Sequence, residues 1–120
     1  MKKMQTYKMP AKRILKYRLP INGDRKIITC SLGRWLAIQP QNGWPHVWVM
    51  VDDNAPQIEY EIISVGTGWD LPIDFKEGNY LGTAQDSAGF VWHYFVQLAD
   101  KEKELEQLMM EAWLDEIFNT

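Results

Sequence analysis

Residues 41–51 read QNGWPHVWVMV, and this stretch decides the fold. Asn42-Gly43 is a hairpin signal, because both residues accept the positive φ angles of a type I′ turn. The valines that follow alternate with His46, Trp48 and Met50, so both faces of this strand are largely apolar. We therefore expect residues 46–51 to form a central strand that is covered on both sides.

Strand and turn patterns flank this stretch in both directions. Alternating or β-branched runs predict further strands over residues 15–19, 27–29, 35–39, 59–65, 80–85 and 90–97. Turn chemistry separates them at Asn22-Gly23-Asp24 and Asp86–Gly89, and a longer loop is expected from Gly66 to Pro72. A chain of 120 residues suggests one domain. The expected fold is mainly β (α+β), an antiparallel sheet folded as a sandwich or partly open barrel with one C-terminal α-helix.

The predicted domain organisation has three parts, which are a flexible basic lead-in (1–10), the β-domain (11–97) and a C-terminal amphipathic helix (98–120). The helix is predicted from apolar residues at helical spacing, namely Leu105, Leu108, Met109, Ala112, Trp113 and Ile117. Two arrangements are open for this helix, because it either caps the sheet of its own chain or packs partly on a second copy. Leu108, Trp113 and Ile117 are the candidates for oligomer or partner contacts.

Charge is distributed unevenly along the chain. Most of the 13 Lys and Arg residues lie in residues 1–34, whereas nearly all of the 16 acidic residues follow them. A molecule polarised in this way steers a charged partner, or attracts a second copy of itself. The candidate binding residues are four bases and two tryptophans expected in loops, where Trp and Arg are typical interface anchors: Lys12, Lys16, Arg18, Arg34, Trp44 and Trp69.

The sequence shows no pattern that is typical of a catalytic or metal centre. His46 and His93 lie in strand patterns, without a second His or Cys at metal-ligand spacing. Cys30 is interpreted as a small buried side chain. Gly66-Thr67-Gly68 would offer backbone amides to a phosphate, but it lacks the Lys-Ser/Thr ending and the helix of a P-loop. We therefore expect no enzyme, no cofactor and no metal, and keep this glycine turn as a candidate binding element.

Three further observations predict the cellular compartment of the protein. The single cysteine cannot form an intramolecular disulfide, and no apolar run approaches the roughly 20 residues that span a bilayer. The basic residues 1–10 are not followed by the apolar segment of a secretory signal. We expect a cytoplasmic protein without membrane contact.

Short motifs keep a fixed order between Ile14 and Val96. They are Leu15-Lys16-Tyr17, Leu19-Pro20-Ile21, Ile38-Gln39, Gln41-Asn42-Gly43, Trp48, Val51-Asp52, Asn54-Ala55-Pro56, Val65-Gly66-Thr67-Gly68, Tyr80-Leu81-Gly82-Thr83, Gly89 and Val91-Trp92-His93. In these motifs the chain resembles a small family of uncharacterised β-domain proteins encoded mainly in bacteriophage genomes, which have no assigned activity. Many members carry a His directly after the Gly-Thr-Gly, where this chain has Trp69.

The resemblance implies a phage gene product made in the cytoplasm of a host cell, and small phage proteins of this kind often act by binding. The expected function is a non-enzymatic binding protein that inhibits a host factor, such as an anti-phage defence complex. A symmetric oligomer that sequesters a signalling nucleotide near Gly66-Thr67-Gly68 is a second hypothesis. Nucleic-acid binding or virion assembly would also fit the sequence. A host protein is the expected partner, and a phosphate-bearing ligand, a nucleic acid and a second copy stay open.

Overall fold

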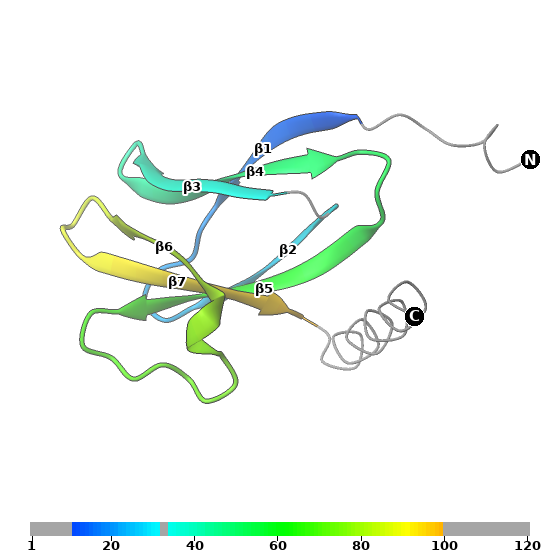
Figure 1. Ribbon diagram of the computed structural model, residues 1–120. Coiled ribbons are helices and arrows are strands. Elements are labelled where there is room, and N and C mark those ends of the chain that lie inside the picture. Colours follow the sequence, from blue (N-terminus) through cyan, green and yellow to red (C-terminus); the bar gives the residue numbers. More distant parts are fainter. Residues whose placement is uncertain (1–10, 32–33, 100–120) are drawn as a thin grey trace, which may run out of the picture.

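The computed structural model describes residues 11–31 and 34–99 (Figure 1). These residues form seven strands and one short 3-10 helix: β1 (Lys12–Arg18), β2 (Arg25–Ser31), β3 (Arg34–Gln41), β4 (Trp44–Asp52), β5 (Gln57–Gly66), η1 (Glu77–Asn79), β6 (Tyr80–Gln85) and β7 (Val91–Leu98). Each strand overlaps one of the predicted strands. The predicted basic lead-in (1–10) and residues 100–120 of the predicted C-terminal helix lie outside the described residues, and Leu98, the first residue of that predicted segment, is the last residue of β7.

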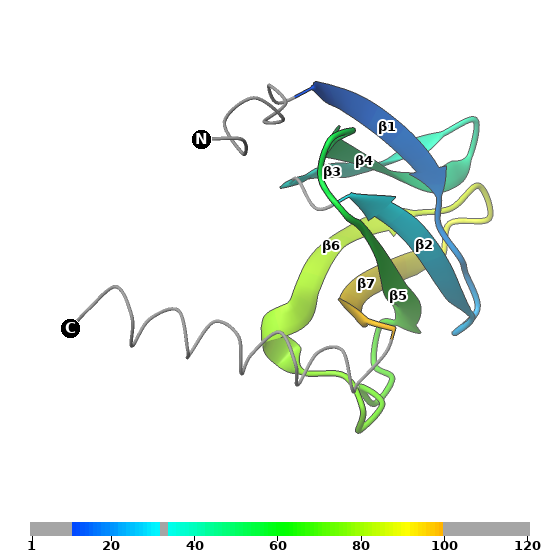
Figure 2. The ribbon, with the colours of Figure 1, turned by 90° about the vertical axis from the view of Figure 1, so that its right-hand side faces the viewer.

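The strands form two antiparallel sheets. One has the order β1-β4-β3 and the other the order β2-β5-β7-β6. In Figure 1 the three-stranded sheet lies above the four-stranded one, and Figure 2 shows β1 at one extreme and the β5–β6 loop at the other. The prediction of a mainly β, antiparallel fold is confirmed. The described strands make two separate sheets and do not close into a barrel, since β3 and β6 stay in different sheets.

β4 is the central strand of its sheet, as residues 41–51 predict. The turn before it has positive φ at both Asn42 (53°) and Gly43 (78°), which is the geometry that the Asn-Gly pair predicts. Val47, Val49 and Val51 are at most 2% exposed. The opposite face is only half-buried at every position, so the prediction of cover on both sides is wrong. The reason is that the four-stranded sheet covers this sheet on one side alone.

The core lies between the two sheets. Ile62 of β5 and Tyr94 of β7 are fully buried against the β4 valines. The Tyr94 hydroxyl donates to the Pro20 carbonyl at 2.8 Å, so this buried polar group has a partner. Cys30 belongs to the same core, and burial raises the pKa of its thiol. A neutral, enclosed thiol is a poor nucleophile, which agrees with its interpretation as a small buried side chain.

The turns of both sheets meet at one end of the molecule, which we call the hairpin end. The Ser87 amide, in the β6–β7 turn, donates to the Gly43 carbonyl of the β3–β4 turn at 2.8 Å. A Cβ added to Gly43 would lie 2.7 Å from the Ser87 Cβ, so the two turns are in close contact. The β1–β2 turn joins them there, because the Leu19 amide donates to the Pro45 carbonyl at 2.9 Å.

Candidate functional site

The outer face of the three-stranded sheet gathers the predicted basic residues. Directly paired residues of an antiparallel sheet point to the same side. Lys16 of β1 pairs with Trp48 of β4, and Arg34 of β3 pairs with Met50 of β4. We call this surface the basic face, and it consists of Lys12, Ile14, Lys16, Arg18, Arg34, Trp44, His46, Trp48, Met50 and one acid, Asp52, which pairs with Lys12.

The cations of the basic face form no ion pair with another described residue. The ion pairs among the described residues join Arg13 to Asp53 at 2.7 Å, and Arg25 to Asp74 at 2.7 Å and to Glu61 at 3.5 Å. On the basic face, the Arg18 guanidinium lies 3.5 Å from the centre of the Trp44 ring, and Lys16 donates to the Gln41 side chain. These two contacts hold the charges of Arg18 and Lys16 at the surface without neutralising them. Lys12 pairs in register with Asp52, which offsets part of its charge.

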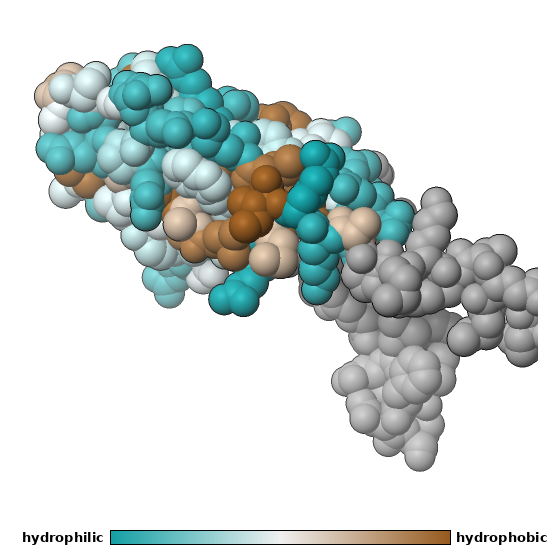
Figure 3. All heavy atoms as spheres, turned by 90° about the horizontal axis from the view of Figure 1, so that it is seen from above, coloured by the Kyte–Doolittle hydropathy of each residue, from teal (hydrophilic) through white to brown (hydrophobic). Residues whose placement is uncertain are grey.

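An apolar strip runs through the basic face beside these charges. Ile14 is 56% exposed and pairs directly with the half-buried Met50. Trp48 and His46 continue the strip along β4, with their ring centres 6.1 Å apart. The His46 Nδ1–H donates to the Trp44 carbonyl at 2.7 Å, which orients the ring. Figure 3 looks onto this side of the molecule and shows hydrophobic side chains bordered by hydrophilic ones.

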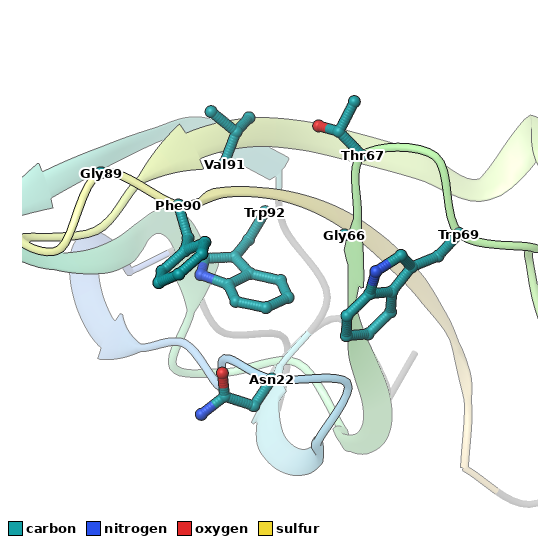
Figure 4. A pocket seen from close by; sticks show the side chains of 8 residues that line it. All are labelled: Asn22, Gly66, Thr67, Trp69, Gly89, Phe90, Val91 and Trp92. Atoms are coloured by element: carbon teal, nitrogen blue, oxygen red, sulfur yellow. The ribbon is translucent and has the colours of Figure 1, made fainter.

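A second surface feature lies at the hairpin end, and we call it the aromatic pocket (Figure 4). It is an open cavity of about 520 Å³ lined by Trp69, Phe90, Trp92, Asn22, Gly66 and Gly89. Thr67 and Val91 also border the cavity, but their side chains point away from the rings. The rings of Phe90, Trp92 and Trp69 follow one another across the cavity in Figure 4.

Two glycines fix the position of Trp69. A Cβ at Gly66 would lie 2.6 Å from the Trp69 Cε2, and one at Gly23 would lie 3.0 Å from its Cζ3. The indole therefore lies against bare backbone, and its edge-to-face contact with Trp92 (5.4 Å, 78°) holds it from the side. Trp69 is still 53% exposed. The ring is thus docked on the domain and displayed to solvent at the same time.

Asp86 orders the opposite wall of the pocket. Its Oδ2 accepts the Trp92 Nε1–H at 2.9 Å, and its Oδ1 accepts the amides of Ala88 (2.9 Å) and Phe90 (3.0 Å). The Trp92 bond first, and then the backbone amides, hold the pKa of Asp86 below its ordinary value of 3.8. The ionised carboxylate is therefore the form that supports the β6–β7 turn.

Asp86→Asn is expected to make the stability of the fold depend less steeply on pH in acid. Because the folded state lowers the pKa of Asp86, the contribution of this carboxylate to stability is complete above the unfolded pKa of 3.8 and is lost as the pH falls through the folded pKa. Thermal unfolding followed by circular dichroism, from about pH 5 to about pH 2, measures this slope. Equal slopes for the wild type and Asp86→Asn would contradict the assigned role.

His93 lies in a chain of hydroxyl contacts on the outer face of the four-stranded sheet. Its Nε2 is 2.8 Å from the Thr67 Oγ1 and its Nδ1 is 2.9 Å from the Thr83 Oγ1, which in turn contacts the Tyr80 hydroxyl. None of the side chains in this series of contacts is a carboxylate or a thiol. Over residues 11–31 and 34–99, no group of three His, Cys, Asp or Glu side chains is placed to hold a metal ion.

The structure divides the predicted site residues between the two features. Lys12, Lys16, Arg18, Arg34 and Trp44 share the basic face, whereas Gly66, Thr67 and Trp69 border the aromatic pocket. Gly68 lies beside the pocket in the same turn, with φ of 85°. Leu108, Trp113 and Ile117 lie outside the described residues. Sequence reasoning missed the roles of Asn22, Phe90 and Trp92, although Asn22 lies in one predicted turn, Phe90 directly follows another, and Trp92 lies in the strand predicted after it.

Comparisons with known proteins give one match. The model of a family described as Domain of unknown function (DUF7352) matches residues 10–105. No curated protein and no solved structure matches the chain. In the part of the chain that the structure describes, no helix has the length and apolarity needed to cross a membrane.

Proposed function

The chain belongs to the DUF7352 family of domains of unknown function, and from this premise we propose that it is a non-enzymatic protein that binds an acidic protein surface on its basic face. The observation that carries the proposal is the gathering of Lys12, Lys16, Arg18 and Arg34 on one open sheet face. None of these four bases forms an ion pair with a described residue. An acidic partner supplies countercharge beyond that of Asp52 and is steered toward this face.

The apolar strip favours a protein partner over a nucleic acid. Ile14, Met50 and Trp48 give the face an apolar centre, and the cations stand beside it. Protein interfaces have this arrangement, with Trp, Met and Arg enriched in the buried centre and polar groups at the rim. A phosphate backbone gains little from Ile14, whose exposed surface would stay in contact with water.

The proposal extends to the role in the cell. The chain is phage-encoded, its partner is a factor of the host such as an anti-phage defence complex, and binding inhibits that factor in the host cytoplasm. The ordered motifs between Ile14 and Val96, which resemble phage-encoded proteins, support this origin. The binding residues of the basic face come from β1, β3 and β4, which are all within the family match.

The test compares two charge reversals that differ only in position. Lys16 lies on the basic face, whereas Lys76 is exposed outside it, before η1. Wild type, Lys16→Glu and Lys76→Glu are used to capture proteins from host lysate, and the captured protein is then purified and titrated. We expect an acidic partner whose affinity falls about tenfold in Lys16→Glu and stays unchanged in Lys76→Glu. Trp48→Ala should weaken binding by about 30-fold, the loss typical of an interface anchor.

Salt and a competing ligand complete the design. Binding should weaken as salt rises, because the cations of the basic face are exposed and screened. If the Lys16→Glu and Lys76→Glu variants bind the captured partner with equal affinity, the proposal is overturned. A single-stranded oligonucleotide that wild type binds in preference to any protein, and that Lys16→Glu fails to bind, would replace the acidic protein with a nucleic acid.

A further inference from the structure

We propose that the aromatic pocket is a separate binding site for a planar, uncharged heterocycle of the purine nucleobase class. Its volume of about 520 Å³ falls within the range of roughly 300–1,000 Å³ that is typical of small-molecule sites. The site lies on the β1–β2, β5–β6 and β6–β7 turns and on the adjoining ends of β5 and β7, and none of its lining residues belongs to the basic face.

The rings give the pocket its preference for a planar ligand. Trp69 lies against Gly66 and Gly23, which leaves its other surface free, and Phe90 is 62% exposed. Between them, Trp92 is 4% exposed and is held by Asp86 and by both rings (5.4 Å to Trp69 and 6.4 Å to Phe90). A flat ring stacks on the exposed aromatic surfaces, as unpaired bases do on aromatic side chains.

The charges around the pocket exclude a site built for phosphate. No residue that lines the cavity carries a charge, and the Asp86 carboxylate accepts the Nε1–H of the lining residue Trp92. A phosphate group would meet that negative charge without a cation to balance it. The Gly66-Thr67-Gly68 turn, which the sequence offers as a phosphate cradle, serves here to seat Trp69, whose amide donates to the Gly66 carbonyl at 3.1 Å.

The polar side chain of Asn22 at the rim has the hydrogen-bonding groups that the edge of a base requires. The Asn22 side chain is exposed and borders the cavity. A carboxamide both donates and accepts, and this is the pair of groups that reads N6 and N7 of adenine. Asn22 has φ of 61° and precedes Gly23, so the turn that holds it is the same one that supports the indole of Trp69.

The experiment titrates the ¹⁵N-labelled full chain with adenosine and follows the indole N–H signals of its tryptophans. We expect the Trp69 and Trp92 signals to move and the Trp48 signal to stay. Adenosine monophosphate should bind no more tightly than adenosine, and ribose, which lacks the base, should not bind. Trp69→Ala should lower the affinity about tenfold, the usual loss when a base loses its stacking ring.

A second variant tests the geometry without removing a ring. Gly66→Ala keeps every aromatic atom but places a methyl group where the Trp69 indole lies, so it should weaken adenosine binding as Trp69→Ala does. Ile73→Ala, at a fully exposed position away from the pocket, is the matched control and should bind normally. Dispersed amide signals in each variant show that it is folded.

Three results would overturn the inference. They are the absence of any indole shift at millimolar adenosine, a monophosphate that binds tenfold more tightly than adenosine, and unchanged adenosine binding in folded Trp69→Ala. The outcome is independent of the proposed function, because Lys16→Glu should bind adenosine normally and Trp69→Ala should still bind the acidic partner.

Discussion

Trp92→Ala should lower the free energy of unfolding by about 3–5 kcal/mol, the range measured when a large aromatic residue is removed from a core. Trp92 is 4% exposed and belongs to the core cluster between the two sheets. The substitution also leaves Trp69 without its edge-to-face contact and Asp86 without its indole donor. A domain of this size is typically stable by about 5–15 kcal/mol, so the variant should be close to unfolding. Urea denaturation followed by circular dichroism measures the loss.

Two comparisons separate the causes of this loss. Trp92→Phe keeps an aromatic ring in the core but removes the N–H that Asp86 accepts, so it should cost less than the alanine variant. Trp48→Ala removes the same side chain from the half-buried outer face of β4, and it should also cost less. If Trp48→Ala lowers stability as much as Trp92→Ala does, the core does not lie where the structure places it.

Gly43→Ala is expected to cost about 2–3 kcal/mol, because it combines backbone strain with a steric clash. Gly43 has φ of 78°, a region that L-residues enter at a cost of about 1–2 kcal/mol. Its new Cβ would also come within 2.7 Å of the Ser87 Cβ, at the contact between the two turns. Denaturant unfolding of the purified variant gives the value.

Gly68→Ala is the matched control for this prediction. Gly68 has a similar φ of 85°, but a Cβ there meets nothing within 4 Å. It should therefore show the backbone cost alone, at about 1–2 kcal/mol. Adding Ser87→Gly to Gly43→Ala should recover the difference, because it removes the atom that clashes. No recovery in the double variant would mean that the two turns are not in contact in solution.

The strands could be predicted from local sequence, because each has its own apolar alternation. The Asn42-Gly43 pair also indicated that β3 and β4 are neighbours, because two strands joined by a two-residue turn pair as an antiparallel hairpin. The remaining pairings could not be predicted. β1 pairs with β4, and β2 pairs with β5, although other strands lie between them in the sequence. The apolar alternation of a strand does not show which distant strand pairs with it. Alternation assigns a residue to a face of its strand, but it does not identify the strand beside it.

The candidate site could be predicted only in part, for the same reason. Lys12, Lys16 and Arg18 are on one face because they lie at even spacing along β1, which the sequence shows directly. Arg34 and Trp44 join them only through the register of β3 and β4. The aromatic pocket draws on three turns that are far apart in the sequence. Its one local signal was Trp69, a large ring in a glycine-rich turn with no neighbouring apolar pattern to bury it.

Among the strands that the structure describes, β1 has one free side, because it pairs with β4 and ends the three-stranded sheet. Unpaired strand edges are where folded β-proteins add further strands and aggregate, and lysine on such a strand discourages this. Lys12, Arg13, Lys16 and Arg18 give β1 four positive charges in seven residues. Three of these charges, on Lys12, Lys16 and Arg18, are also the ones that we assign to partner binding. They therefore keep copies of the chain apart as well, and neutral substitutions on β1 should favour aggregation where charge reversal does not.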